Sequence, residues 1–219
     1  MKPIPAPVFA HAGDLLVARV GESAFAFMPG RTGHYFAYGS GIDRPMSDWR
    51  RDDFYGHGGP LATEDAFRAA VLEQHRHQVE RGRLGRITET IVASTPWGMA
   101  QSTTIYGPGI RKHATASHGG FEIDRERNRH VHEVVRTGGW YEEDCEWAIV
   151  AFSFPELFPT YERHQAERTI RHSMPEAWEA IHGRPLQAGE SDERDRLRGR
   201  QADHAPYDHP EEFWAVGRS

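Results

Sequence analysis

The chain has 219 residues, of which 38% are hydrophobic, so it can bury a core as one large domain or as two small packed halves. Its net charge of -6 disfavours nucleic acid as a partner, because nonspecific binding needs many contacts to phosphates. The sequence lacks the run of roughly 18 apolar residues that a membrane span needs, and its start lacks the apolar run of a signal peptide. We therefore expect a soluble, cytoplasmic protein without a membrane partner. The single cysteine, Cys145, excludes an intrachain disulfide and a cysteine-rich zinc site.

The N-terminal segment is predicted to form an antiparallel meander followed by a helix. Alternating apolar residues separated by turn-forming residues predict strands over 14–20, 23–28 and 34–38. Thr63 is the expected N-cap of a helix that runs to about Arg81 and ends at Gly82, since carboxylates in its first turn favour the helix dipole. The pattern therefore predicts a β-β-β-α half over residues 10–82.

A period of two returns after residue 86 and predicts a second meander. Its strands are expected over 87–92, 99–106, 110–116 and 121–123. Asp124 is the expected cap of a helix that continues to about Val135. With the helices that follow, this gives an α+β fold in which antiparallel β-meanders pack with helices, and a second half over residues 86–182.

A buried helix is predicted to begin at Tyr141 and to continue to about Phe152, because the segment is apolar nearly all round. Three carboxylates would then occupy its first turn, and Cys145 would lie one turn inside it. Residues 183–219 are rich in charged residues, glycine and proline and have few apolar anchors, which predicts a loosely attached tail.

Three sequence motifs carry a resemblance to a known family. They are Thr-Pro-Trp-Gly-Met-Ala-Gln at 95–101, Thr-Ala-Ser-His-Gly-Gly at 115–120 and Gly-Gly-Trp-Tyr-Glu-Glu-Asp-Cys-Glu-Trp-Ala at 138–148. Over about residues 87–172 the chain resembles an uncharacterised domain family, a domain of unknown function met mainly in proteobacterial plasmids, integrated elements and phages. The resemblance implies a setting in a mobile genetic element and no particular reaction.

One candidate catalytic centre pairs His118 with Cys145, because a thiol nucleophile needs a nearby base. A carboxylate of Glu142, Glu143 or Asp144 would orient the imidazole. The alternative is that Cys145 is an unreactive core residue, which is the more common role of a cysteine on an apolar helix.

Ser117 extends this candidate centre. It precedes His118-Gly119-Gly120, and a His-Gly-Gly loop can offer backbone N–H groups to an oxyanion, as in some hydrolases. The alternative is a tight turn in which Gly119 and Gly120 adopt positive φ values.

Aromatic and polar residues of the same motifs form a candidate binding surface. Trp97, Trp140 and Tyr141 could stack on a ring of a ligand or, alternatively, lie in the core. The candidate binding residues are Trp97, Gln101, Gly119, Gly120, Trp140, Tyr141 and Glu142.

The 14 histidines raise the question of a metal site. His113, His118 and the His130-x-His132 pair could combine with the carboxylates that follow Tyr141. No pair shows the i, i+4 spacing of a helical metal motif, so no metal ligand is assigned and no cofactor is identified.

Two main functional hypotheses result. The first is an accessory binding protein of a plasmid or phage, which inhibits a host defence complex by presenting an acidic surface to a protein partner. The second is an enzyme, a hydrolase or transferase centred on His118 with Cys145, Ser117 and the acidic residues. A small metalloprotein is a third hypothesis. The sequence does not indicate the oligomeric state.

Overall fold

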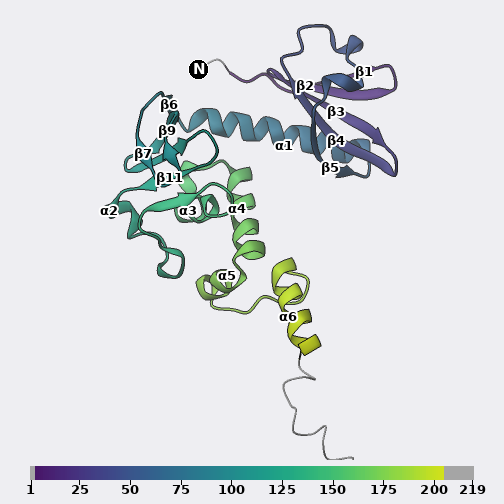
Figure 1. The fold of residues 1–219 in the computed structure, drawn as a ribbon. Helices are drawn as coiled ribbons and strands as arrows, with labels where there is room; N and C mark the ends of the chain where they lie inside the picture. The colour runs from purple at the N-terminus through teal and green to yellow at the C-terminus, as the bar shows by residue number, and fades with distance from the viewer. Residues whose placement is uncertain (1–2, 205–219) are drawn as a thin grey trace, which may run out of the picture. The chain divides into compact units, whose positions relative to one another are not determined.

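The computed structural model of the chain describes residues 3–204 and contains two compact units (Figure 1). The first unit runs to Gly85 and includes Pro159–Tyr161, and the second contains the rest of the described chain. Both units combine antiparallel strands with helical segments, which confirms the predicted α+β class. No helix within residues 3–204 is both long and apolar enough to cross a membrane.

The first unit contains a five-stranded antiparallel sheet whose strands are neighbours in chain order. Its strands are β1 (Val8–Ala12), β2 (Leu15–Val20), β3 (Ser23–Gly30), β4 (Gly33–Ser40) and β5 (Gly56–Leu61). The three strands of the predicted meander correspond to β2, β3 and β4 and are confirmed. Strands β1 and β5 extend the sheet beyond that prediction on both edges.

Strand β5 has the sequence of a loop, and side chains of its neighbour explain why it is a strand. A Cβ atom on Gly56 would lie 2.0 Å from the ring of Tyr38, and one on Gly58 would lie 2.8 Å from the ring of Phe36. Both rings come from β4, so they lie against the glycine backbone of β5 and supply the packing that its own side chains lack.

Helix α1 (Glu64–Arg83) packs on one face of this sheet. The hydroxyl of Thr63 accepts a 3.1 Å hydrogen bond from the amide of Ala66, which confirms the predicted N-cap. Phe67 and Val71 are fully buried against β2, β3 and β4. The opposite face packs on Trp49, which lies between the 3-10 helices η1 (Met46–Asp48) and η2 (Arg51–Asp53).

The second unit contains another five-stranded antiparallel sheet and a short hairpin. The sheet has the order β12-β11-β10-β9-β6, with β6 (Ile87–Glu89), β9 (Ser102–Gly107), β10 (Ile110–Ala114), β11 (Gly119–Ile123) and β12 (Trp140–Glu142). The hairpin consists of β7 (Ser94–Thr95) and β8 (Gly98–Met99). The predicted second meander is therefore confirmed for β6, β9, β10 and β11, although the first of its strands is much shorter than expected.

The prediction of a helix from Tyr141 onward is wrong at its start. Trp140–Glu142 pairs with β11 as strand β12, and helix α3 covers only Trp147–Ser153. Pairing with β11 buries the ring of Tyr141 completely, and this burial outweighs the local helical pattern. Cys145 consequently lies in the turn before α3 and not inside a helix.

The helix predicted after Asp124 is also shorter than expected. Asp124 does cap it, since its carboxylate accepts a 2.8 Å hydrogen bond from the amide of Arg127. Helix α2 then ends at Asn128 after a single turn (Arg125–Asn128), and η3 (Glu133–Val135) follows as a separate 3-10 turn.

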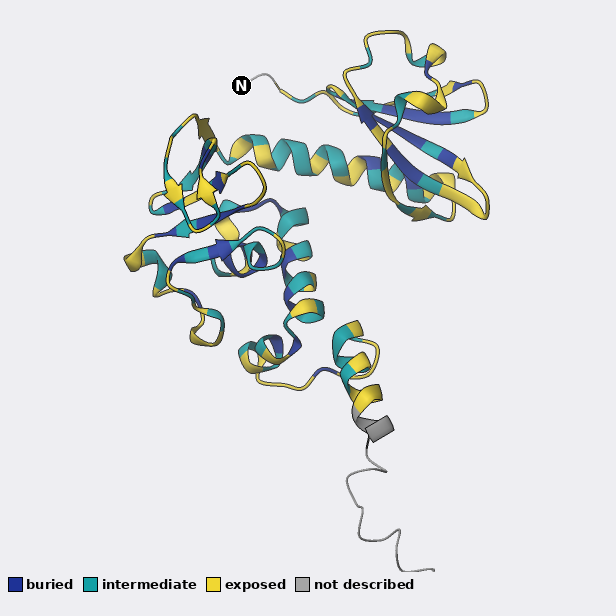
Figure 2. Ribbon diagram, in the orientation of Figure 1, coloured by how far each residue is buried: buried dark blue, intermediate teal, exposed yellow. Residues whose placement is uncertain are grey.

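The core of the second unit lies between one face of its sheet and the helices that follow. Phe121 and Tyr141 from the sheet are buried in the same cluster as Val150 of α3, Ile170 of α4 and Trp178 of α5. Figure 2 colours the ribbon by burial, with buried positions in dark blue. The helical elements are α3, η4 (Pro155–Leu157), α4 (Thr160–Ser173), α5 (Pro175–His182) and α6 (Asp192–His204).

Candidate functional site

The three sequence motifs meet on the sheet of the second unit. The indole of Trp97 lies across Gly120 of β11, because a Cβ atom at Gly120 would come within 2.3 Å of that ring. Trp97 also meets Trp140 of β12 in a T-shaped contact, with ring centroids 5.8 Å apart. We call Trp97, Gly119, Gly120, Trp140 and Glu143 the motif cluster.

Gly119 is held by the third motif in the same way. The amide of Glu143 donates a 3.0 Å hydrogen bond to the carbonyl of Gly119. A Cβ atom at Gly119 would lie 2.6 Å from the carbonyl oxygen of His113 and 2.8 Å from a carboxylate oxygen of Glu143. Neither Gly119 nor Gly120 has a positive φ. The tight-turn alternative for these glycines is therefore wrong, since they are strand residues that must be small.

The acidic residues after Tyr141 stabilise the turn between β12 and α3. A carboxylate oxygen of Glu142 accepts a 3.1 Å hydrogen bond from the amide of Asp144. The carboxylate of Glu146 accepts a 2.8 Å bond from the amide of Glu142. These residues do not occupy a first helical turn, because the chain is still extended at Glu142. Asp144 is exposed, whereas Glu142 and Glu143 are half-buried.

Within residues 3–204, no side-chain hydrogen bond connects His118, Ser117 and Cys145 of the predicted catalytic centre. His118 and Ser117 are exposed in the loop between β10 and β11, where the carbonyl of His118 accepts a 2.7 Å hydrogen bond from the hydroxyl of Thr115. Cys145 is half-buried in the turn before α3. Across the described part of the chain, no hydrogen bond joins the imidazole of His118 to Cys145 or to an acidic residue. Their catalytic roles stay predictions that this geometry does not support.

The remaining candidate binding residues have separate environments. Gln101 is exposed, and its backbone amide donates a 2.8 Å hydrogen bond to the carbonyl of Ala114. Tyr141 is fully buried, and its hydroxyl donates a 2.6 Å bond to the side chain of Asn128. Among residues 3–204, no group of three or more histidine, cysteine or acidic side chains is placed to hold a metal ion.

A buried polar chain that was not predicted from the sequence lies on the face of the sheet that carries Trp140. His113 is 2% exposed, and its Nδ1 atom lies 2.9 Å from the hydroxyl of Thr103 on β9. Its Nε2 atom lies 3.1 Å from the carboxylate of Glu122 on β11, and Arg111 is 3.4 Å from the same carboxylate. The alternation of residues along β10 indicates which face of the sheet His113 occupies. Its hydrogen-bond partners could not be predicted in the same way, because they depend on the register between the strands.

This polar chain has the order hydroxyl, imidazole, carboxylate, but it is not placed for catalysis. Thr103 is fully buried, so a substrate has no access to its hydroxyl. The two hydrogen bonds of His113 instead satisfy polar groups that would otherwise be unpaired inside the sheet. Thr103, His113 and Glu122 therefore join three strands beneath the motif cluster.

Residues 87–99 carry exposed apolar side chains on an ordered backbone, and we call this range the hairpin segment. Ile87 is 57%, Val92 76% and Met99 56% exposed. The backbone is fixed by a 2.7 Å hydrogen bond from the hydroxyl of Thr95 to the carbonyl of Gly98 and by the packing of Trp97 on the sheet. Strand β6, which carries Ile87, is also an edge strand.

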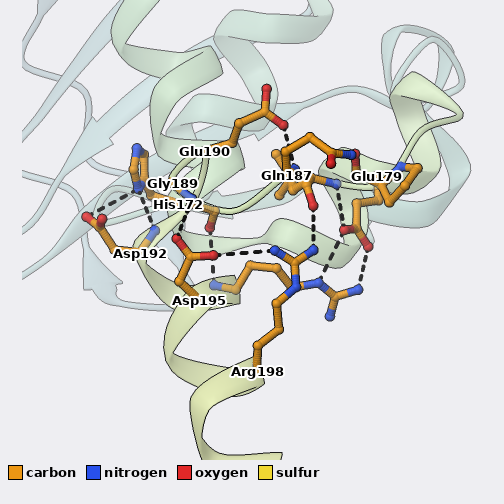
Figure 3. A network of polar contacts seen from close by, with 12 residues as sticks. His172, Glu179, Gln187, Gly189, Glu190, Asp192, Asp195 and Arg198 are labelled. Atoms are coloured by element: carbon orange, nitrogen blue, oxygen red, sulfur yellow. Dashed lines mark hydrogen bonds and ion pairs between the residues drawn. The ribbon is translucent and has the colours of Figure 1, made fainter. Parts of the chain in front are cut away.

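Ion pairs tie the segment after α5 to the second unit, although the sequence predicts a loose tail there. The carboxylate of Glu179 accepts a 2.9 Å bond from the amide of Leu186 and a 2.6 Å bond from Arg194 of α6 (Figure 3). Glu190 forms a bidentate pair with Arg184, at 2.8 and 2.9 Å. This network extends through Arg198, and residues 205–219 of the predicted tail lie outside the described part of the chain.

Two carboxylates of this network have shifted pKa values. The Arg184 guanidinium and the amide of Gln187 lower the pKa of Glu190 from 4.5 to about 2. The amide of Leu186 and the guanidinium of Arg194 lower the pKa of Glu179. Both groups therefore favour the folded segment in their ionised form.

We expect the attachment of residues 184–198 to weaken as the pH falls from about 4.5 toward 2. A lowered folded pKa gives stability that is present above the unfolded value and is lost as the pH drops through the folded value. The protection factors of the backbone amides of Gln187 and Gly189, which correct the exchange rates for the intrinsic effect of pH, should fall toward the acidic end of this range.

The matched variants are Glu190→Gln and, as the control, Glu126→Gln, whose side chain is exposed on α2. Glu190→Gln should exchange faster at neutral pH and lose part of the pH dependence, whereas Glu126→Gln should follow the parent. An unchanged pH profile in Glu190→Gln would show that the pair with Arg184 does not hold the segment.

The comparisons with known proteins identify a family and no function. A family model described as Domain of unknown function (DUF7007) matches residues 90–205. This range contains the three motifs of the motif cluster. No curated protein and no solved structure matches the chain.

Proposed function

The chain belongs to the DUF7007 family of domains of unknown function, and from this premise we propose that it is a protein-binding module whose contact surface is the hairpin segment. The observation that carries the proposal is the exposure of Ile87, Val92 and Met99 within one ordered stretch. Several exposed apolar side chains within one segment of the surface are typical of regions that bind another protein.

The motif cluster explains why this surface is ordered. Trp97 lies between the two strands of the hairpin and packs on Gly120, so the family motif holds the hairpin against the sheet. A fixed loop loses less conformational entropy when it binds than a mobile one does. The motif residues would then serve to present the contact surface and not to catalyse a reaction.

The edge of the sheet adds a second means of contact. Strand β6 pairs with β9 on one side only, and Ile87 lies on β6. An edge strand offers backbone N–H and C=O groups to an extended segment of a partner. We therefore infer a protein partner that places an extended, apolar segment along β6 and the hairpin. The contact surface in this proposal is apolar and not acidic, because its exposed side chains include Ile87, Val92 and Met99.

The proposal also includes a biological setting. We infer that the chain is an accessory binding protein of a bacterial plasmid or phage and that its partner belongs to a host defence complex. The support is the resemblance to a family met in such elements, together with a fold in which, among residues 3–204, no hydrogen bond joins the imidazole of His118 to Cys145 or to an acidic residue. The rival proposal, an enzyme centred on His118 with Cys145, has no geometric support in the described residues.

Charge placed on the hairpin segment should abolish binding of the partner. The test variant is Val92→Asp with Met99→Asp, because two carboxylates would oppose burial of this surface. The parent and the variant would be immobilised and exposed to lysate of a host strain, and the captured protein would then be purified and its affinity measured. We expect the affinity of the double variant to fall at least about a hundredfold, the loss of two buried apolar contacts.

Val134→Asp is the matched control, since Val134 is 51% exposed on η3, outside the hairpin segment. It should bind like the parent. The parent should also raise the plating efficiency of a phage on a host that carries the partner, and the double variant should not. Equal binding by the parent and the double variant would exclude the hairpin segment as the contact surface.

A further inference from the structure

A cavity of about 360 Å³ lies in the first unit, between α1 and strands β3, β4 and β5. This volume is within the range of about 300 to 1,000 Å³ that small-molecule sites have. Its lining includes five aromatic residues and two glutamines, Phe25, Phe36, Tyr38, Tyr55, Tyr161, Gln74 and Gln78. Neither the motifs nor the proposed protein contact uses this cavity.

Tyr38 provides a flat platform in this cavity. One face of its ring lies on the backbone of Gly56, because a Cβ atom there would come within 2.0 to 2.4 Å of three ring atoms. The side chain is nevertheless 41% exposed, so the rest of the ring is open to solvent. Gly56 thus permits a ring on which another ring can stack.

Tyr55 forms an adjoining wall. Its ring meets Tyr38 in a T-shaped contact with centroids 6.1 Å apart. Its hydroxyl is 2.9 Å from the hydroxyl of Ser40, which also lines the cavity, so the wall is held in place although the residue is exposed. Two tyrosines at right angles can contact the face and the edge of one ligand ring.

The glutamines of α1 supply hydrogen-bonding groups. Gln78 donates a 3.0 Å bond to the hydroxyl of Ser23, which fixes its amide at the cavity wall. Gln74 lies one helical turn earlier and is half-buried, and within residues 3–204 no hydrogen bond engages its side chain. An amide provides both a donor and an acceptor, so it can pair with the edge of a polar ring.

The described residues that line this cavity include no charged side chain, in a chain of which 26% is charged. A ligand with a phosphate or carboxylate would find no cation there, and a cationic ligand would find no carboxylate. The cavity therefore favours an uncharged ligand.

We propose that this cavity binds an uncharged ring with hydrogen-bonding groups on its edge, which stacks on Tyr38 and is held by the amide of Gln74. A nucleobase and a neutral sugar ring both have this chemistry. Nucleobases present donors and acceptors around a planar face, and pyranose rings present hydroxyls around an apolar face.

The experiment is saturation-transfer NMR on the full chain with adenosine, adenosine monophosphate and N-acetylglucosamine as separate probes. We expect adenosine or N-acetylglucosamine to bind with its ring protons closest to the protein, at millimolar concentrations or below. The monophosphate should bind no more tightly than adenosine. Binding by adenosine alone would identify a nucleobase site, and binding by the sugar alone would identify a carbohydrate site.

The variants are Tyr55→Ala and Gln74→Leu, with Leu72→Ala as the control on an exposed position of α1 outside the cavity. Each cavity variant should weaken binding about tenfold, the effect of losing one aromatic contact or one hydrogen bond, and the control should bind like the parent. Melting temperatures verify that all three are folded. Failure of both uncharged probes to bind, or unchanged binding in both cavity variants, would overturn the proposal.

Discussion

Replacement of Gly120 by alanine should destabilise the second unit by about 3 kcal/mol, the upper end for overpacking of a well-packed site. The new methyl group would lie 2.3 Å from the ring of Trp97 and 2.4 Å from the carbonyl oxygen of Tyr141. The indole could rotate away, but the carbonyl belongs to the neighbouring strand β12, so the strand itself would have to move. Urea unfolding of the parent and the variant measures the difference in free energy.

Gly138→Ala is the control for this prediction. Gly138 belongs to the same motif, has no positive φ and has no heavy atom within 4 Å of a Cβ position. Its replacement should change the unfolding free energy by less than about 0.5 kcal/mol, as for ordinary surface substitutions. Equal stability of Gly120→Ala and the parent would mean that Trp97 does not pack on β11 in solution.

Replacement of His113 by alanine should cost about 2 to 4 kcal/mol, since it leaves a void in a buried position and removes the partner of a buried hydroxyl. The hydroxyl is that of Thr103, which is fully buried and has His113 as its hydrogen-bond partner. The carboxylate of Glu122 would also lose its contact with the imidazole. Thermal unfolding of the purified chain should show a clear fall in melting temperature.

His118→Ala is the informative comparison, because both residues were candidates from sequence. The imidazole of His118 is exposed in a loop, so its removal should leave the unfolding free energy within about 0.5 kcal/mol of the parent. A large loss of stability in His118→Ala, with none in His113→Ala, would contradict the described register of β10 and β11.

These two predictions bear directly on the proposed function. If Gly120 and His113 are required for folding, the family motifs and the polar chain beneath them stabilise the same framework, the sheet of the second unit. The exposed hairpin segment could then contact a partner without disturbing that framework. Substitutions there should change binding and leave stability nearly unaltered.

The sequence alone determined the elements whose pattern is local. Alternation of apolar residues gave β2, β3 and β4, and the side chains of Thr63 and Asp124 marked two helix starts that the structure confirms. These signals are readable because each depends on residues only a few positions apart. The α+β class follows from the same patterns.

The tertiary structure decided the features that depend on distant residues. Tyr141 and Glu142 are predicted at the start of a helix but pair with β11 in strand β12, and the glycine-rich residues 56–61 pair with β4 as strand β5. In both cases long-range packing of aromatic rings, those of Tyr141 and Tyr38, outweighs local propensity. Contacts between distant residues also determine which side chains form the candidate sites. The partners of His113 and the lining of the aromatic cavity come from separate elements, so only strand register and helix packing bring them together.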